Sequence, residues 1–130
     1  MKLKCLMIGL VFSGIALGQV AIAHDNSVKA KPMHGGQLVE DAASHTGIEM
    51  VASASALTFH VTEHLKPLDV TGGAFKAIVQ TDDGMKMHSL VTEGSVLTAK
   101  LNVPLPTGAR IAFTGKDKDG QVFQARFVMP

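Results

Sequence analysis

Short runs in which apolar and polar residues alternate recur from residue 47 to the end of the chain, with turn-forming residues between them. A period of two places apolar side chains on one face of a strand, whereas an amphipathic helix needs a period of 3.6 residues. No stretch has helical periodicity long enough to form the crossover helix of a parallel sheet. The pattern therefore predicts an all-β fold, an antiparallel immunoglobulin-like sandwich of about seven strands. The expected strands cover residues 47–52, 56–62, 74–81, 86–91, 96–103, 110–115 and 122–128.

The alternation also predicts the core, since every second residue of a strand faces the same side. On this register His60 points outward, and the longer connection 66–73 carries the chain from one sheet to the other. In the strand 86–91 two alternatives stay open, with either Met87, Ser89 and Val91 or His88 and Leu90 facing inward. The expected core consists of Leu57, Phe59, Val61, Phe75, Ala77, Val79, Leu97, Ala99, Leu101, Val103, Ile111, Phe113, Phe123, Ala125 and Phe127.

The first 23 residues have the three parts of a secretory signal peptide in the usual order. Lys2 and Lys4 form the charged part, an apolar run covers residues 6–17, and small residues end the segment at Ala23. The run is shorter than the roughly 20 residues that span a membrane. Cys5 lies before the run, and no lipobox with its cysteine stands at the end of the run. We therefore expect cleavage after Ala23, a periplasmic location and no membrane anchor after cleavage.

Residues 24–36 form a polar, irregular segment in which Lys31 and Pro32 disfavour a helix. We expect this segment to be a short flexible arm that carries histidine and methionine. The remaining residues, 37–130, are enough for one β-sandwich domain that buries its own core.

Charge and cysteine content exclude several classes of function. The net charge of +1 falls to about −1 once Lys2 and Lys4 leave with the signal peptide, and no basic cluster remains to bind nucleic acid or an anionic membrane. The mature chain has no cysteine, which excludes disulfides, thiolate zinc sites, iron–sulfur clusters and blue-copper centres. Any metal must be held by histidine, methionine, carboxylate or the terminal amine.

Catalytic motifs are absent from the sequence. There is no Gly-x-Ser-x-Gly, no phosphate-binding loop and no His-Glu-x-x-His, and the chain lacks tyrosine and tryptophan. We therefore expect a protein that is not an enzyme.

His24 becomes the amino-terminal residue if the signal peptide is cleaved after Ala23. The new α-amine, with a pKa near 8, and the neighbouring imidazole would form a bidentate nitrogen chelate for Cu(II). The alternative is a mobile terminus without function.

Two short motifs combine soft and borderline metal ligands. Met33-His34-Gly35-Gly36 places a thioether and an imidazole next to glycines that let the backbone fold tightly, or it is only a loop before the first strand. Met85-Lys86-Met87-His88 places two thioethers at strand spacing, suitable for Cu(I) or Ag(I). His88 would then face away from both, and the alternative is that Met87 belongs to the core.

The remaining histidines are His45, His60 and His64. On a continuous strand His60 and His64 share a face but lie about 13 Å apart, too far to bind one ion. A bend at Glu63 and His64 would bring them closer. His45 precedes the strand that holds Glu49.

The segments 32–39, 48–51, 56–64 and 66–69, with His34-Gly35-Gly36 and Thr62-Glu63-His64 as the most specific positions, carry a family resemblance. The chain resembles small exported proteins encoded beside heavy-metal efflux systems, and the His-Gly-Gly accessory segment of periplasmic adaptors of metal-exporting resistance-nodulation-division pumps. The likeness covers about residues 32–128 and implies periplasmic handling of copper, silver, zinc, cobalt or nickel, with His34 and His64 as the matching polar positions. The chain departs from this family by His60, where an aromatic residue is usual, and by Gly47, where a bulky one is usual. A looser likeness, resting on His24, is to exported β-sandwich copper carriers.

These features predict a periplasmic heavy-metal-binding protein that acts as a carrier or buffer linked to metal efflux. The metal ion is its expected partner, together with a periplasmic efflux adaptor protein. An alternative is a β-sandwich interaction module that contacts such an adaptor and binds no metal. The candidate ligands for copper, silver or zinc are His34, His24, His64 and His88, with Met33, Met85 and Met87 added for Cu(I) or Ag(I).

Overall fold

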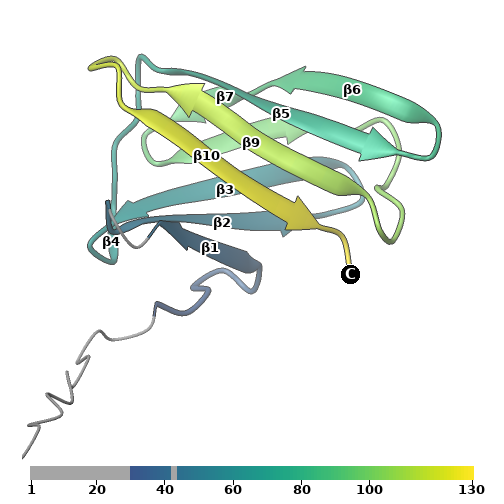
Figure 1. Ribbon diagram of the computed structural model, residues 1–130, viewed down its shortest axis with the longest axis horizontal. Coiled ribbons are helices and arrows are strands. Elements are labelled where there is room, and N and C mark those ends of the chain that lie inside the picture. Colours follow the sequence, from purple (N-terminus) through teal and green to yellow (C-terminus); the bar gives the residue numbers. More distant parts are fainter. Residues whose placement is uncertain (1–29, 42–43) are drawn as a thin grey trace, which may run out of the picture.

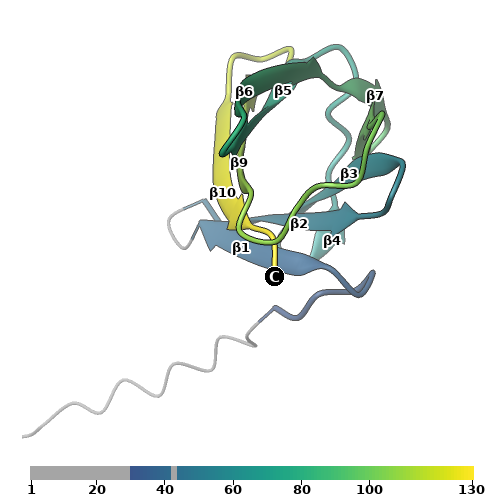
Figure 2. The same cartoon turned by 90° about the vertical axis from the view of Figure 1, so that its right-hand side faces the viewer.

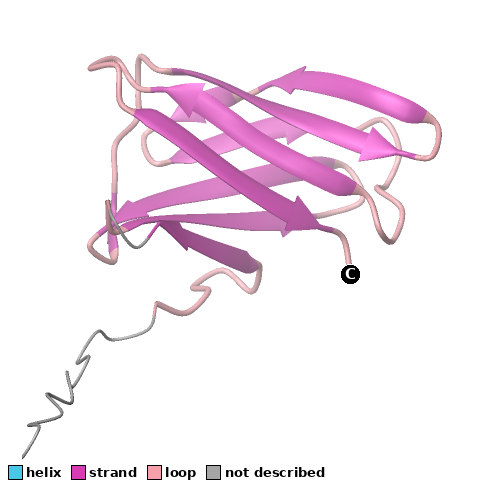
Figure 3. Cartoon of the chain, viewed as in Figure 1, coloured by secondary structure: helices cyan, strands magenta, loops and turns pink. Residues whose placement is uncertain are grey.

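The computed structural model describes residues 30–41 and 44–130, which form ten strands in two antiparallel sheets (Figures 1 and 3). No helix occurs in this part of the chain, and so none that is long and apolar enough to cross a membrane. Residues 1–23, expected to be a signal peptide, and His24 lie outside the described residues.

The first sheet has the strand order β1-β2-β3-β8-β7, and the short β4 pairs with β3. Its strands are β1 (Gln37–Asp41), β2 (Thr46–Ala52), β3 (Ala56–Glu63), β4 (Lys66–Pro67), β7 (Val91–Glu93) and β8 (Val96–Lys100). The second sheet has the order β10-β9-β5-β6. It consists of β5 (Ala74–Thr81), β6 (Gly84–Ser89), β9 (Arg110–Lys116) and β10 (Val122–Val128).

The strand order confirms the immunoglobulin-like sandwich. The path β2-β3-β8-β7 corresponds to A-B-E-D, and β10-β9-β5-β6 corresponds to G-F-C with one further strand beside C. The chain changes sheet between β3 and β5, as the long connection predicted. The two sheets also meet along β1 and β10 (Figure 2). There the Gln37 side-chain amide donates to the carbonyl of Val128.

All seven expected strands form, and β1, β4 and β7 are additional. The two shortest, β4 and β7, contain two and three residues, too few for a period of two to stand out. β1 lies ahead of the first expected strand and pairs with β2 along its whole length, from Gln37 opposite Met50 to Asp41 opposite Thr46.

The core lies between the sheets and agrees with the predicted faces except at one position. Phe59 and Phe113 are its largest fully buried side chains, with ring centroids 4.9 Å apart. Val103 was expected inside and is 63% exposed, so this assignment was wrong. β8 ends at Lys100, because Lys100 lies opposite Ala56, the residue at which its partner β3 begins.

The structure decides which face of β6 points inward. His88 is half-buried and Leu90, which follows the strand, is buried, whereas Met85 and Met87 are 69% and 65% exposed. The methionines therefore share the outer face of the second sheet, and His88 faces away from both of them.

Candidate metal-binding face

Four histidines gather on the outer face of β2 and β3, in two stacked pairs: His34 with His60, and His45 with His64. We call this surface, together with Glu49, the histidine face. Its residues come from the segment before β1, from one end of the β2–β3 pair and from the middle of both strands. Glu49 of β2 lies opposite His60 of β3, whereas His45 and His64 flank the last pair of that ladder.

Glu49 is the centre of the first pair. Its carboxylate accepts hydrogen bonds from the backbone N–H groups of Met33 (2.8 Å), His34 (2.8 Å) and Gly36 (2.9 Å). The side chain is only 5% exposed, because the segment it binds covers it. These bonds tie residues 33–36 to the outer face of the sheet, so this end of the expected arm is attached to the domain. We call this arrangement the carboxylate clasp.

The clasp sets the protonation state of Glu49. Burial by itself raises the pKa of the carboxyl group, but the backbone N–H groups of Gly36, Met33 and His34 and the His34 side chain hold it below the ordinary value of 4.5. Glu49 is therefore ionised at neutral pH and acts only as an acceptor.

An ionised Glu49 also fixes the tautomer of His34. Nδ1 of His34 lies 3.1 Å from Oε1 of Glu49, and a carboxylate can only accept, so Nδ1 carries the proton. In the neutral ring Nε2 is then left with its lone pair, and the side chain is 45% exposed. A carboxylate that holds one nitrogen of a histidine while the other is free is the arrangement that orients histidine ligands in metal sites.

His60 lies flat against His34, with ring centroids 3.6 Å apart and an angle of 3° between the planes. Burial lowers the pKa of His60 below its ordinary value of 6.5, the proximity of His34 lowers it further, and Glu49 partly opposes both effects. Metal ions bind imidazole nitrogen along the lone pair, in the plane of the ring. Two parallel planes this close cannot both direct a lone pair at one ion, so His60 supports the His34 ring instead of sharing its metal.

The second pair is wider and depends on the backbone. The rings of His45 and His64 have centroids 4.9 Å apart and an angle of 27° between their planes, and both residues are exposed. The N–H of His64 donates to the carbonyl of His45 (3.0 Å), one step beyond the β2–β3 ladder. Both residues have positive φ, 55° and 50°, as does Leu65 with 67°.

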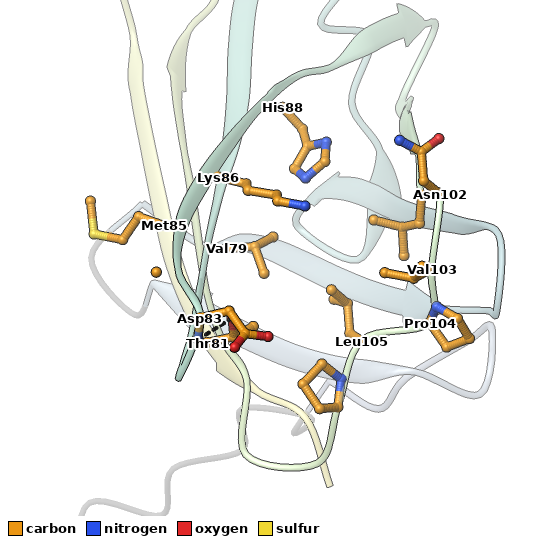
Figure 4. Close-up of a pocket in the computed structure, with 13 residues that line it drawn as sticks. Val79, Thr81, Asp83, Met85, Lys86, His88, Asn102, Val103, Pro104 and Leu105 are labelled. Carbon is orange, nitrogen blue, oxygen red and sulfur yellow. Dashed lines mark hydrogen bonds between the residues drawn. The ribbon is translucent and has the colours of Figure 1, made fainter.

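The other predicted ligands are not brought to this face. Met33 lies beside the clasp and is 71% exposed, whereas His88 and Lys86 point into a groove of about 410 Å³ between β6 and residues 101–106 (Figure 4). Met85 points to the other side of β6 in the same view. The histidine face and the β6 strand therefore belong to different regions of the molecule.

The pairing of His34 with His60, the pairing of His45 with His64 and the clasp at Glu49 were not predicted from sequence. One signal for the clasp was present, namely a lone carboxylate between the apolar residues Ile48 and Met50, in a strand with no facing lysine or arginine. Among residues 30–41 and 44–130, no group of three or more histidine, aspartate or glutamate side chains is arranged to hold a metal ion. Either pair could therefore provide at most two protein ligands to an ion.

Comparisons with known proteins add nothing to this geometry. No protein-family model, no curated protein and no solved structure matches the chain.

Proposed function

We propose that the protein binds a transition-metal ion at His34 and acts in the periplasm as a heavy-metal carrier or buffer linked to metal efflux. The observation that carries the proposal is the Glu49–His34 contact, which occupies Nδ1 and leaves Nε2 as the nitrogen open to a metal, on a side chain that is 45% exposed. Neutral imidazole suits Zn(II), Cu(II), Co(II) and Ni(II).

The exposure of the site favours a carrier over a permanent structural site. Structural zinc sites are closed by four protein ligands, whereas His34 provides one ligand and leaves the other positions accessible. Exposed Met33 is adjacent and supplies a thioether when the ion is Cu(I) or Ag(I). An ion held in this way is readily passed to a second protein, such as a periplasmic efflux adaptor.

Thermal unfolding with Cu(II), Cu(I), Ag(I), Zn(II), Co(II) or Ni(II) at pH 7.5 tests the proposal. Binding to the folded state alone stabilises it by about 2.7 kcal/mol at a hundredfold excess over the dissociation constant, a melting shift on the order of 10 °C or more for a domain of this size. His34→Ala should reduce the shift, and His88→Ala, at the distant groove, is the matched control.

Two outcomes count against the proposal. An unchanged melting temperature with all six ions would contradict metal binding and favour the interaction module for an efflux adaptor. A shift that His34→Ala leaves intact would place the metal elsewhere.

A further inference from the structure

We propose that His45 and His64 form a second metal site, a two-histidine chelate for a borderline divalent cation such as Zn(II), Cu(II) or Ni(II). The inference goes beyond the proposed function, because it uses neither His34 nor Glu49. It rests on the ring geometry, the backbone conformation and the exposure of this pair.

The ring separation fits chelation of one ion. When two imidazoles bind a single ion, each metal–nitrogen distance is about 2.0–2.1 Å and the nitrogen–metal–nitrogen angle lies between the tetrahedral and the square-planar value. The two ring centroids are then about 5 Å apart. The observed separation of His45 and His64 is 4.9 Å. With 27° between their planes the rings are still stacked, so they must turn about their own side-chain bonds to direct both lone pairs at one ion, and both side chains are exposed. The parallel stack of His34 on His60, at 3.6 Å, has no such freedom.

The backbone at this pair adopts a conformation that is uncommon for residues other than glycine. Within the described residues, the non-glycine positions with positive φ are His45, His64 and Leu65. His64 and Leu65 connect β3 to β4 as a two-residue turn with two positive φ values, the form that Asn-Gly adopts readily and that a branched side chain resists. Left-handed residues other than glycine concentrate at functional sites, where the surrounding structure holds them.

The consequence of this conformation is the position of the His64 ring. The backbone hydrogen bond from His64 to His45 fixes the distance between the two main chains, and the turn places the rings against each other at the exposed end of the β2–β3 pair. A turn chosen only for stability would contain Asn or Gly at these positions. The sequence instead places an imidazole in the strained turn, facing another imidazole in a left-handed conformation.

The ligand set indicates the class of ion. Two imidazoles without a thioether match borderline divalent cations better than the soft ions Cu(I) and Ag(I). Two protein ligands leave the remaining coordination positions to water or to a ligand from another molecule, so the bound ion stays exchangeable.

Site-resolved nuclear magnetic resonance of the histidine side-chain nitrogens, during a titration with Zn(II) alone at pH 7.5, tests the proposal. In the unmodified protein the ring nitrogens of His45 and His64 should shift together, with one common midpoint. His64→Asn should raise the Zn(II) concentration needed to shift His45 at least tenfold, and His45→Asn should have the same effect on His64. His34→Ala should leave this midpoint unchanged.

The substitutions to asparagine also control for unfolding. Asparagine tolerates a left-handed backbone better than histidine does, so His64→Asn should melt at the same temperature as the unmodified protein or higher without metal. Leu65→Gly changes the turn and keeps both rings, and it should leave the Zn(II) midpoint within about twofold.

Several results would overturn the inference. Different midpoints for His45 and His64, or a His45 response that survives His64→Asn, would show that the rings do not share an ion. A response of His34 alone would contradict this second site and leave the proposed function standing. A response of His45 and His64 without a response of His34 would support this second site and contradict the proposed function.

Discussion

The two histidine pairs on the outer face of β2 and β3 are held by opposite means. The stack of His34 on His60 depends on side-chain chemistry, because the buried carboxylate of Glu49 binds the backbone and the ring of the segment that carries His34. The pair of His45 and His64 depends on the main chain, which adopts a left-handed conformation at both residues. The first arrangement orients a single ligand, and the second sets the distance between two. Each can be disturbed without touching the other.

The largest expected effect comes from removing the carboxylate. Glu49→Ala leaves three backbone N–H groups and one imidazole N–H without their charged acceptor, and we expect it to lower the free energy of unfolding by about 3 kcal/mol. Denaturant unfolding measures this loss. Hydrogen exchange should show faster exchange at the amides of Met33, His34 and Gly36, while the N–H of His64 stays protected.

Glu49→Gln is the matched control, since it keeps the shape and one acceptor oxygen and should cost about half as much. Equal protection of the Met33 amide in Glu49→Ala and in the unmodified protein would show that the clasp does not hold this segment.

Alanine substitutions at two neighbouring glycines of residues 33–36 compare the cost of a steric clash with the cost of backbone strain. A Cβ on Gly36 would lie 2.2 Å from the carbonyl oxygen of Met50, a main-chain atom that cannot move aside, so Gly36→Ala should cost about 2 kcal/mol. A Cβ on Gly35 meets nothing within 4 Å, and only its φ of +74° resists alanine, at about 1 kcal/mol. Thermal unfolding of both variants shows which substitution destabilises the protein more. A larger cost at Gly35 would mean that residues 33–36 do not lie against β2 as described.

Acid should weaken the first pair in two steps. The pKa of His60 in the folded protein lies below 6.5, so the folded protein favours the neutral ring. The stability that comes from this preference is fully present above pH 6.5 and is lost as the pH falls through the lowered pKa. The pKa of Glu49 lies below 4.5, so its contribution is present above pH 4.5 and lost on further acidification. Unfolding of the metal-free protein as a function of pH measures both. His60→Phe should flatten the upper step and Glu49→Gln the lower one, and unchanged profiles would argue against both assignments.

Relief of the strained turn should stabilise the metal-free protein slightly. Leu65 has a φ of 67° and is 49% exposed, so Leu65→Gly removes strain at little cost in burial. The extra freedom of glycine in the unfolded chain offsets part of the gain, and we expect a net increase of about 0.5–1 kcal/mol in the free energy of unfolding. Denaturant unfolding is again the measurement. A loss of stability would mean that the Leu65 side chain has a packing role that outweighs the strain.

The smallest effect is expected beneath the second pair. Thr46 follows His45, and its buried hydroxyl oxygen has no hydrogen-bond partner within the described residues. Thr46→Val keeps the shape of the side chain and removes this unpaired group, so the free energy of unfolding should stay the same or rise by less than about 1 kcal/mol. A loss of 1 kcal/mol or more in thermal unfolding would show that the hydroxyl supports the turn through a bond that forms in solution.

The sequence by itself determined most of the fold. Alternation of the kind seen in Leu57, Phe59 and Val61 fixes which side of a strand is buried, because a strand repeats every two residues and apolar side chains leave water. The same rule placed His60 outside and left β6 undecided, since both of its faces carry residues that pack acceptably. β8 ends earlier than alternation suggested, because its partner β3 begins at Ala56, opposite Lys100, and alternation carries no information about where a partner strand begins.

Only the tertiary structure decided which histidines meet. His34 and His60 are 26 positions apart, and their contact depends on a buried carboxylate that recruits the segment before β1, a long-range bond that no local period encodes. His45 and His64 meet because β2 and β3 are in a fixed register and because the chain adopts positive φ at both residues. Sequence determines which residues prefer water and which prefer the core, through local chemistry. Distances between side chains on different strands follow from register and from long-range hydrogen bonds, which exist only once the sheets have formed.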